Sequence, residues 1–219
     1  MKKQFVIMFV VLAIMAAPSL AAMEPFRLVF TTSTTHDALS TDIEVYNAWV
    51  QGLADAANIG MGGMYGDLEW NVLGSTAEVD AKDNTGTNPD VDGAGVPIYL
   101  VDGITKVADD NADLWDGDID HIIDLDEKGG QGYPHLWVFT GTTLDGTAAP
   151  GDFGPLGTPV NGSITQGNGG STSQWIWRAW TGASADSQLA MYAMSEIIPE
   201  PATLALLGLG SLTFLRRKK

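Results

Sequence analysis

The 219-residue sequence contains no cysteine and only 11 lysine and arginine residues, against 27 aspartate and glutamate residues. The absence of cysteine excludes disulfide bonds, thiol catalysis, cysteine-ligated zinc and iron–sulfur clusters. The shortage of positive charge argues against nucleic acid and anionic lipid as partners, because their phosphates are bound by lysine and arginine. The sequence also lacks Gly-Lys-Ser/Thr and His-Glu-x-x-His motifs. We therefore expect no enzymatic activity and no catalytic residues.

Long hydrophobic runs are absent too. The first apolar run follows Lys2 and Lys3, covers residues 5–17 and precedes small residues at Ser19 and Ala21. A membrane span needs roughly 20 residues, so this run is too short to be a comfortable one. A basic start, a short apolar stretch and small residues two apart are the parts of a cleavable secretory signal. We expect residues 1–21 to engage the secretion translocase and to be cleaved after Ala21.

The second apolar run, residues 202–215, is followed directly by four basic residues. As a helix it would be about 21 Å long at roughly 1.5 Å per residue. The hydrocarbon core of a membrane is about 30 Å thick, so the run suits transient insertion better than a permanent anchor. The terminal cations would stay on the cytoplasmic side. Both ends of the chain therefore predict one topology, with the domain exported and held briefly at the inner membrane.

A short proline motif stands immediately before this second run. The order Pro-Glu-Pro, short apolar helix and terminal basic cluster resembles the PEP-CTERM sorting signal of bacteria with an outer membrane. The resemblance implies that an exosortase-type membrane protease recognises residues 198–219. It also implies a final place in the periplasm, on the outer surface or in the extracellular matrix, with exopolysaccharide as a partner. Whether the tail is cut or kept stays open. The residues that carry the resemblance are Pro199, Glu200, Pro201, Arg216 and Arg217.

Residues 22–197, between the two signals, are long enough for one domain with a sizeable core. Six of the 11 basic residues and one of the 27 acidic residues lie in the terminal segments. The domain therefore holds 26 acidic and five basic residues, a formal net charge of −21. Such a charge suits solubility, a salty medium or divalent cations.

The domain is predicted to be α+β, with a mostly antiparallel sheet and two helices. Residues 41–57 predict a helix, because Thr41 and Glu44 match a capping box and the apolar residues recur on one face. A short helix is expected within residues 108–115, and residues 96–107 predict a hairpin around an Asp-Gly turn. Residues 141–173 are rich in glycine, threonine and proline and are expected to form a long surface loop. The remaining strands are expected at residues 28–31, 70–73, 136–140 and 189–195.

Several stretches, among them residues 70–76, 138–146 and 191–195, are similar to bacterial secreted domains with a C-type-lectin-like or endostatin-like fold. The resemblance covers most of residues 26–197. It implies a C-type-lectin-like domain flanked by an N-terminal signal peptide and a C-terminal hydrophobic helix. The Glu-Pro-Asn and Trp-Asn-Asp motifs with which C-type lectins bind calcium and sugar do not occur. The resemblance therefore does not extend to their mechanism of sugar binding.

Two groups of residues are candidates for a site. The first matches positions 1, 3, 5, 9 and 12 of a calcium loop, whose carboxylates converge on one ion, although His121 stands where such a loop needs glycine. Calcium binding and a solvated acidic loop both stay open. The second group, Trp175 and Trp177, would share one face of a strand, as a platform for a sugar ring or as part of the core. The calcium candidates are Asp116, Asp118, Asp120, Asp124 and Glu127.

These observations favour an exported, non-enzymatic protein that serves binding or structure in the exopolysaccharide layer. The alternative is a calcium-dependent carbohydrate-binding module. A less favoured alternative is a hydrolase of surface polymers that uses Asp67 and Glu69 as its two carboxylates.

Overall fold

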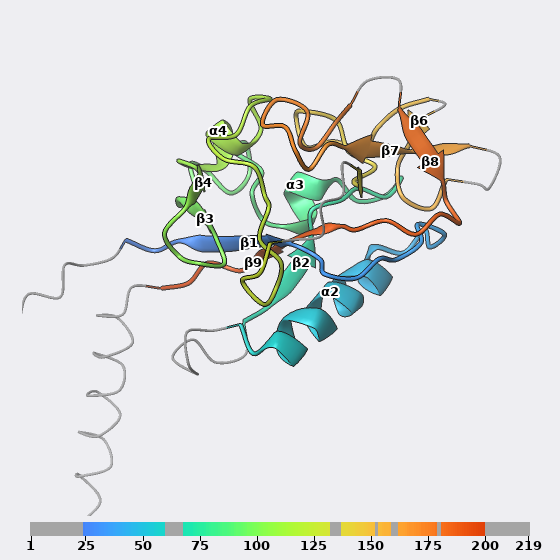
Figure 1. Cartoon of the computed structure of the whole chain (residues 1–219). Coiled ribbons are helices and arrows are strands. Elements are labelled where there is room, and N and C mark those ends of the chain that lie inside the picture. Colours follow the sequence, from blue (N-terminus) through green and yellow to red (C-terminus); the bar gives the residue numbers. More distant parts are fainter. Residues whose placement is uncertain are drawn as a thin grey trace, which may run out of the picture. The chain divides into compact units, whose positions relative to one another are not determined.

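The structure is a computed structural model that describes residues 24–59, 68–131, 137–151, 153–158, 162–178 and 181–199. Within the chain, Phe26–Ile198 forms one compact unit. This unit is mainly sheet with few helices, which confirms the mixture of strands and helices expected from the sequence (Figure 1). The expected signal peptide with Ala21 and the expected C-terminal helix lie outside the described residues. Among the residues that are described, no helix has the length and apolarity needed to span a membrane.

A five-stranded sheet runs through the middle of the unit. The first strand, β1 (Arg27–Thr31), is parallel to β3 (Ile98–Leu100) and antiparallel to β9 (Tyr192–Ser195), so the first and last strands of the unit are neighbours. β3 and β4 pair antiparallel, which confirms the predicted hairpin. The strand order is β2 (Trp70–Val72), β9 (Tyr192–Ser195), β1 (Arg27–Thr31), β3 (Ile98–Leu100) and β4 (Lys106–Ala108).

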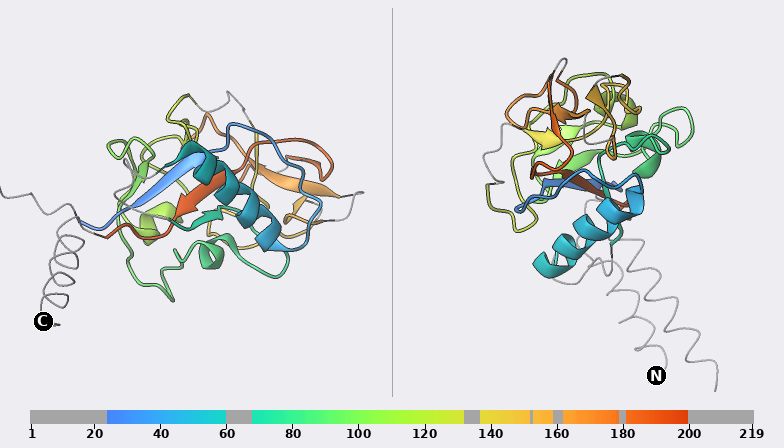
Figure 2. Two further views of the ribbon diagram at one scale, coloured as in Figure 1. Left: turned by 90° about the horizontal axis from the view of Figure 1, so that it is seen from below. Right: turned by 90° about the vertical axis from the view of Figure 1, so that its right-hand side faces the viewer.

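Both faces of this sheet are covered, and every residue of β1 is buried. Because side chains alternate along a strand, Leu28 and Phe30 face one side and Val29 faces the other. On the first side they join Tyr46 and Val50 of helix α2 (Ile43–Ala57) in one core cluster. Figures 1 and 2 show α2 lying along this face, with the other elements on the opposite side.

The start of α2 differs slightly from the prediction. The Asp42 carboxylate, and not the Thr41 hydroxyl, caps the helix by accepting a hydrogen bond from the Glu44 amide at 3.1 Å. The helix ends at Asn58, which adopts the left-handed conformation with φ 53°. The predicted helix is confirmed, with its N-cap moved by one residue.

A second sheet and two short helices cover the other face (Figure 1). Val29 joins Leu114, Trp175 and Tyr192 in this second core cluster. The prediction gave two helices, and α3 (Ala81–Asn84) is the one that it missed. The second sheet contributes to both core clusters, with Val138 in the second and Phe139 and Ile164 in the first. The further elements are α3 (Ala81–Asn84), α4 (Asn111–Leu114), β5 (Val138–Phe139), β6 (Phe153–Gly154), β7 (Ser163–Gly167) and β8 (Gly182–Ser184).

The predicted surface loop over residues 141–173 is wrong, because this stretch contains β6 and β7. Strand β7 is the centre of the second sheet, paired with β5, β6 and β8. Its last residue, Gly167, lies so close to the chain at Trp175 that an added Cβ would overlap the Trp175 carbonyl oxygen. Glycine here permits close packing of two backbones and does not mark a turn.

Candidate functional site

Trp175 and Trp177 do not lie in a strand and do not share a surface. The Trp175 side chain is fully buried, with ring centroids 5.8 Å from Trp115 and 6.0 Å from Tyr192. Trp177 is half-buried and lines an open depression. The structure therefore gives the two tryptophans different environments, one inside the core and one at the surface.

The backbone on both sides of Trp177 is attached to the second sheet. The Ile176 carbonyl oxygen accepts a hydrogen bond from the Thr140 hydroxyl at 2.6 Å, and the Arg178 amide donates to the Gln166 carbonyl oxygen at 2.8 Å. These two bonds hold the intervening Trp177 in place.

The depression around Trp177 has a volume of about 350 Å³ and is shallow. Its other wall is a short hairpin in which Thr142 pairs antiparallel with Ala148. The hairpin is tied to the body by a bond from the Ala148 amide to the Asp80 carboxylate at 2.7 Å. The lining residues are Thr143, Leu144, Asp145, Thr147, Ala148, Pro150 and Trp177.

Asp145, at the tip of this hairpin, is exposed but well anchored. One of its carboxylate oxygens accepts hydrogen bonds from the Thr143 hydroxyl and from the Thr147 hydroxyl, the second at 2.7 Å. The Thr143 hydroxyl is the main cause that lowers the pKa of Asp145, with Thr147 and the Lys82 charge acting in the same direction. The carboxylate thus stays ionised, and its second oxygen takes part in none of these bonds.

Among the residues that the structure describes, none that lines this depression has a basic side chain. The Arg178 guanidinium, one residue from Trp177, lies over the Trp137 ring, 4.2 Å from its centroid. The described lining therefore offers an aromatic ring, hydroxyl groups and a carboxylate. This combination suits a ligand with both an apolar face and hydroxyl groups.

The five calcium candidates belong to residues 116–127, a segment that packs against the second core cluster. Ile119 and Ile123, within the same segment, are buried in the second core cluster. Of the five, only Asp120 belongs to a described group of three acidic residues whose ligand atoms lie within 4.8 Å of one another, with Asp109 and Asp113. The Asp116 carboxylate instead accepts a hydrogen bond from the Asp118 amide at 3.1 Å. Asp124 lies 4.0 Å from the Nδ1 atom of His121.

Two more of the five candidates, Asp120 and Glu127, also have partners within the chain. The Lys106 ammonium group forms ion pairs with Asp109 and, at 3.2 Å, with Asp120, and these bonds raise the pKa of Lys106. Glu127 is buried, and its two oxygens accept hydrogen bonds from the Ser33 amide, at 2.8 Å, and the Ser33 hydroxyl. A calcium ion would have to displace these partners.

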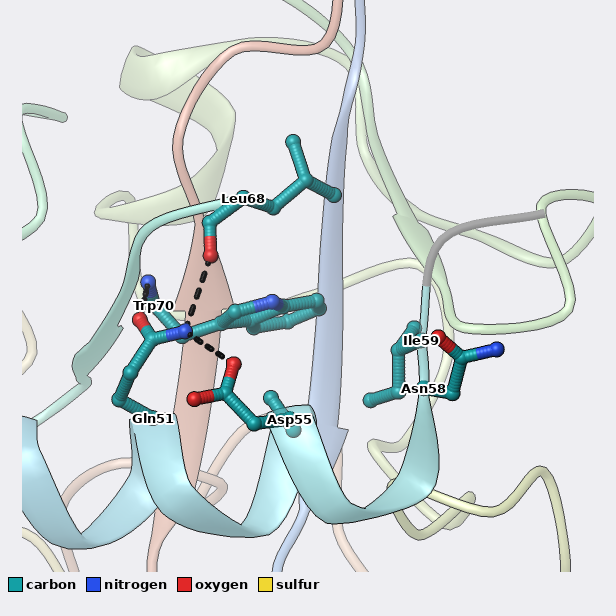
Figure 3. A pocket seen from close by; sticks show the side chains of 7 residues that line it. Gln51, Asp55, Asn58, Ile59, Leu68 and Trp70 are labelled. Carbon is teal, nitrogen blue, oxygen red and sulfur yellow. Dashed lines mark hydrogen bonds between the residues drawn. The ribbon is translucent and has the colours of Figure 1, made fainter. Parts of the chain in front are cut away.

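A second hollow, of about 290 Å³, lies where the end of α2 meets β2 (Figure 3). Its most central polar group, the Gln51 side chain, accepts from the Trp70 amide and donates to Asp55 and to the Leu68 carbonyl oxygen, at 2.8, 2.8 and 3.0 Å. These bonds link α2 to β2 and use all the hydrogens of the Gln51 amide. Gln51 therefore has a structural role. Asp67, one of the two carboxylates of the hydrolase alternative, lies outside the described residues.

Of the depression, sequence reasoning found Trp177 and missed the hairpin. The Asp145-Gly146 dipeptide is a turn signal that would have indicated it. Gly146 has φ 81°, which favours glycine, and an added Cβ would lie 2.9 Å from the Trp115 ring.

Comparison with known families supports the C-terminal signal. The PEP-CTERM protein-sorting motif matches residues 198–219. This motif implies an exported, membrane-processed protein that is recognised by an exosortase, a membrane protease. Ile198 and Pro199 are the residues of the match that the structure describes. A search of curated proteins finds no similar sequence.

Proposed function

We propose that the exported domain is a non-enzymatic glycan-binding component of the exopolysaccharide layer, and that it holds the glycan at the depression around Trp177. The observation that carries the proposal is the meeting of a half-buried Trp177 ring with the Thr143 and Thr147 hydroxyls and the Asp145 carboxylate. The C-type-lectin-like resemblance and the domain limits of residues 22–197 belong to the same hypothesis.

The chemistry of the lining favours sugars over other ligands. A sugar ring has an apolar face of C–H groups, which packs on an aromatic plane, and hydroxyl groups at its edge, which bond to a carboxylate. Because the described lining contains no lysine or arginine and the domain is strongly acidic, a neutral sugar should bind better than an acidic one.

The test is binding of the purified protein to immobilised neutral and acidic polysaccharides, compared with a Trp177→Ala variant. Trp49 provides a matched control because it is also half-buried, on α2 against the His36 ring at 4.8 Å. We expect Trp177→Ala to weaken binding to a neutral glycan about tenfold or more, and Trp49→Ala to leave it unchanged. Equal binding by the two variants would remove Trp177 from the site.

Calcium-dependent carbohydrate binding is the second candidate, and the group of Asp109, Asp113 and Asp120 is the observation that favours it. Glycan binding measured with millimolar calcium and then with a chelator distinguishes the two candidates. Binding that persists in the chelator supports the first candidate, and binding that disappears supports the second.

A further inference from the structure

A short antiparallel bridge ties together the two ends of the compact unit. The Phe26 amide donates to the Ile198 carbonyl oxygen at 3.2 Å, and the Ile198 amide donates to the Phe26 carbonyl oxygen at 2.8 Å. The Ile198 side chain is fully buried in the core cluster that contains the inward side chains of α2. The packed part of the fold therefore extends to Ile198.

The sorting motif begins at this same residue. The family match starts at residue 198, and Pro199 follows directly. Proline has no amide hydrogen with which to continue the bridge. No spacer separates the last buried residue from the Pro-Glu-Pro sequence, so the chain passes from the fold to the motif within one residue.

We propose that the bridge between Phe26 and Ile198 sets the upstream limit of exosortase processing. In the folded protein, no peptide bond before the one that joins Ile198 to Pro199 is cut. This inference rests on the exosortase sorting described above. A protease draws the residues around the cleaved bond into its active site, and residues that are packed and hydrogen-bonded must detach first. The cut breaks one peptide bond and adds one water molecule across it, which leaves a new carboxylate on the domain.

The cost of detachment follows from the contacts. Detaching Ile198 exposes one buried isoleucine side chain and breaks two backbone hydrogen bonds, which makes the open form about a thousandfold rarer than the closed form. Cleavage upstream of Ile198 should be slower by about that factor than cleavage of an unprotected bond. Ile197 is a matched control, because it precedes Ile198 in the chain and its side chain is 44% exposed.

The first test uses proteinase K on the purified full-length chain, with the C-terminal residue of the resistant core identified by mass spectrometry. We expect the wild type and Ile197→Ser to retain Ile198. Ile198→Ser loses the buried side chain, so trimming upstream of residue 198 should be about a hundredfold faster. Near-UV circular dichroism and the milder Ile198→Val variant separate a weakened bridge from general unfolding. Wild-type protein trimmed to Ser195 or beyond as fast as Ile198→Ser would overturn the proposal.

The second test is the C-terminal residue of the protein processed in a bacterium that contains an exosortase. We expect Ile198 or a later residue at the new end. A new end upstream of Ile198 would refute the role of the bridge. Export without any cut would instead contradict processing by the exosortase, and the proteinase K comparison would still decide what the bridge does.

Discussion

Replacing Trp175 should mainly lower the stability of the domain, whereas replacing Trp177 should mainly weaken glycan binding, although the two residues are only two positions apart. Trp175 is fully buried between Trp115 and Tyr192, so its replacement by alanine removes a large side chain and leaves a cavity. Such changes cost about 3–5 kcal/mol. For a unit of this size the melting temperature should fall by about 10 °C or more. The half-buried Trp177 should cost far less stability when it is replaced.

The assay is thermal unfolding followed by circular dichroism, combined with glycan binding at a temperature where both variants are folded. Trp175→Phe refines the test. The Trp175 Nε1–H has no hydrogen-bond partner in the described part of the chain, so removing it relieves an unsatisfied donor and offsets part of the lost packing. The reasoning is refuted if Trp175→Ala has the same melting temperature as the wild type, or if Trp177→Ala has the lower melting temperature of the two alanine variants.

Three further predictions concern the rest of the unit. Gly52→Ala on α2, where an added Cβ meets nothing within 4 Å, should raise the unfolding free energy by about 1 kcal/mol. Gly141→Ala should lower it by about 1–3 kcal/mol, because Gly141 has φ 62° and an added Cβ would lie 2.5 Å from the Leu156 nitrogen. Urea unfolding measures both changes. Lys106→Met removes the cation that neutralises Asp109 and Asp120. Millimolar calcium should therefore raise the melting temperature of this variant more than that of the wild type or of the control variant Lys82→Met. Equal shifts in the three proteins would contradict the account. The Thr143 hydroxyl is the main cause that lowers the pKa of Asp145 in the folded protein. The ionised carboxylate therefore adds stability above about pH 4, its ordinary pKa, and this stability is lost as the pH falls through the folded-state pKa. Because Asp145 is exposed, Asp145→Asn should change the unfolding free energy by only a few tenths of a kcal/mol between pH 3 and 5 in an acid titration.

Local patterns predicted the local elements well. The period of apolar residues in α2 and the Asp-Gly turn between β3 and β4 act over a few positions, so they are visible in one sequence. The N-cap was misplaced because Thr41 and Asp42 are adjacent and both are good capping residues. Only the three-dimensional contacts decide between them.

The second sheet was missed because its central strand does not alternate apolar and polar residues. In β7, Thr165 and Gln166 are both buried, and the Thr165 hydroxyl donates to the Phe153 carbonyl oxygen at 2.6 Å. Hydrogen bonds to distant segments make this polar strand stable, and no pattern within the strand reveals them.

The candidate site was predicted only in part, because it too depends on contacts between segments that are far apart in the sequence. Trp177 stands out by its residue type, but the hairpin that completes the depression is about 30 residues away in the sequence. The expectation that Trp175 would lie on the same face assumed a strand, and the chain bends at this point instead. The C-terminal motif was found because its whole signal lies in 22 consecutive residues.

The most direct test of the account is the N-terminal residue of the protein recovered from each fraction of a cell that contains an exosortase. The account predicts a chain that begins at Ala22 and is found in the envelope or the medium. A chain that retains Met1 and stays in the cytosol would contradict it.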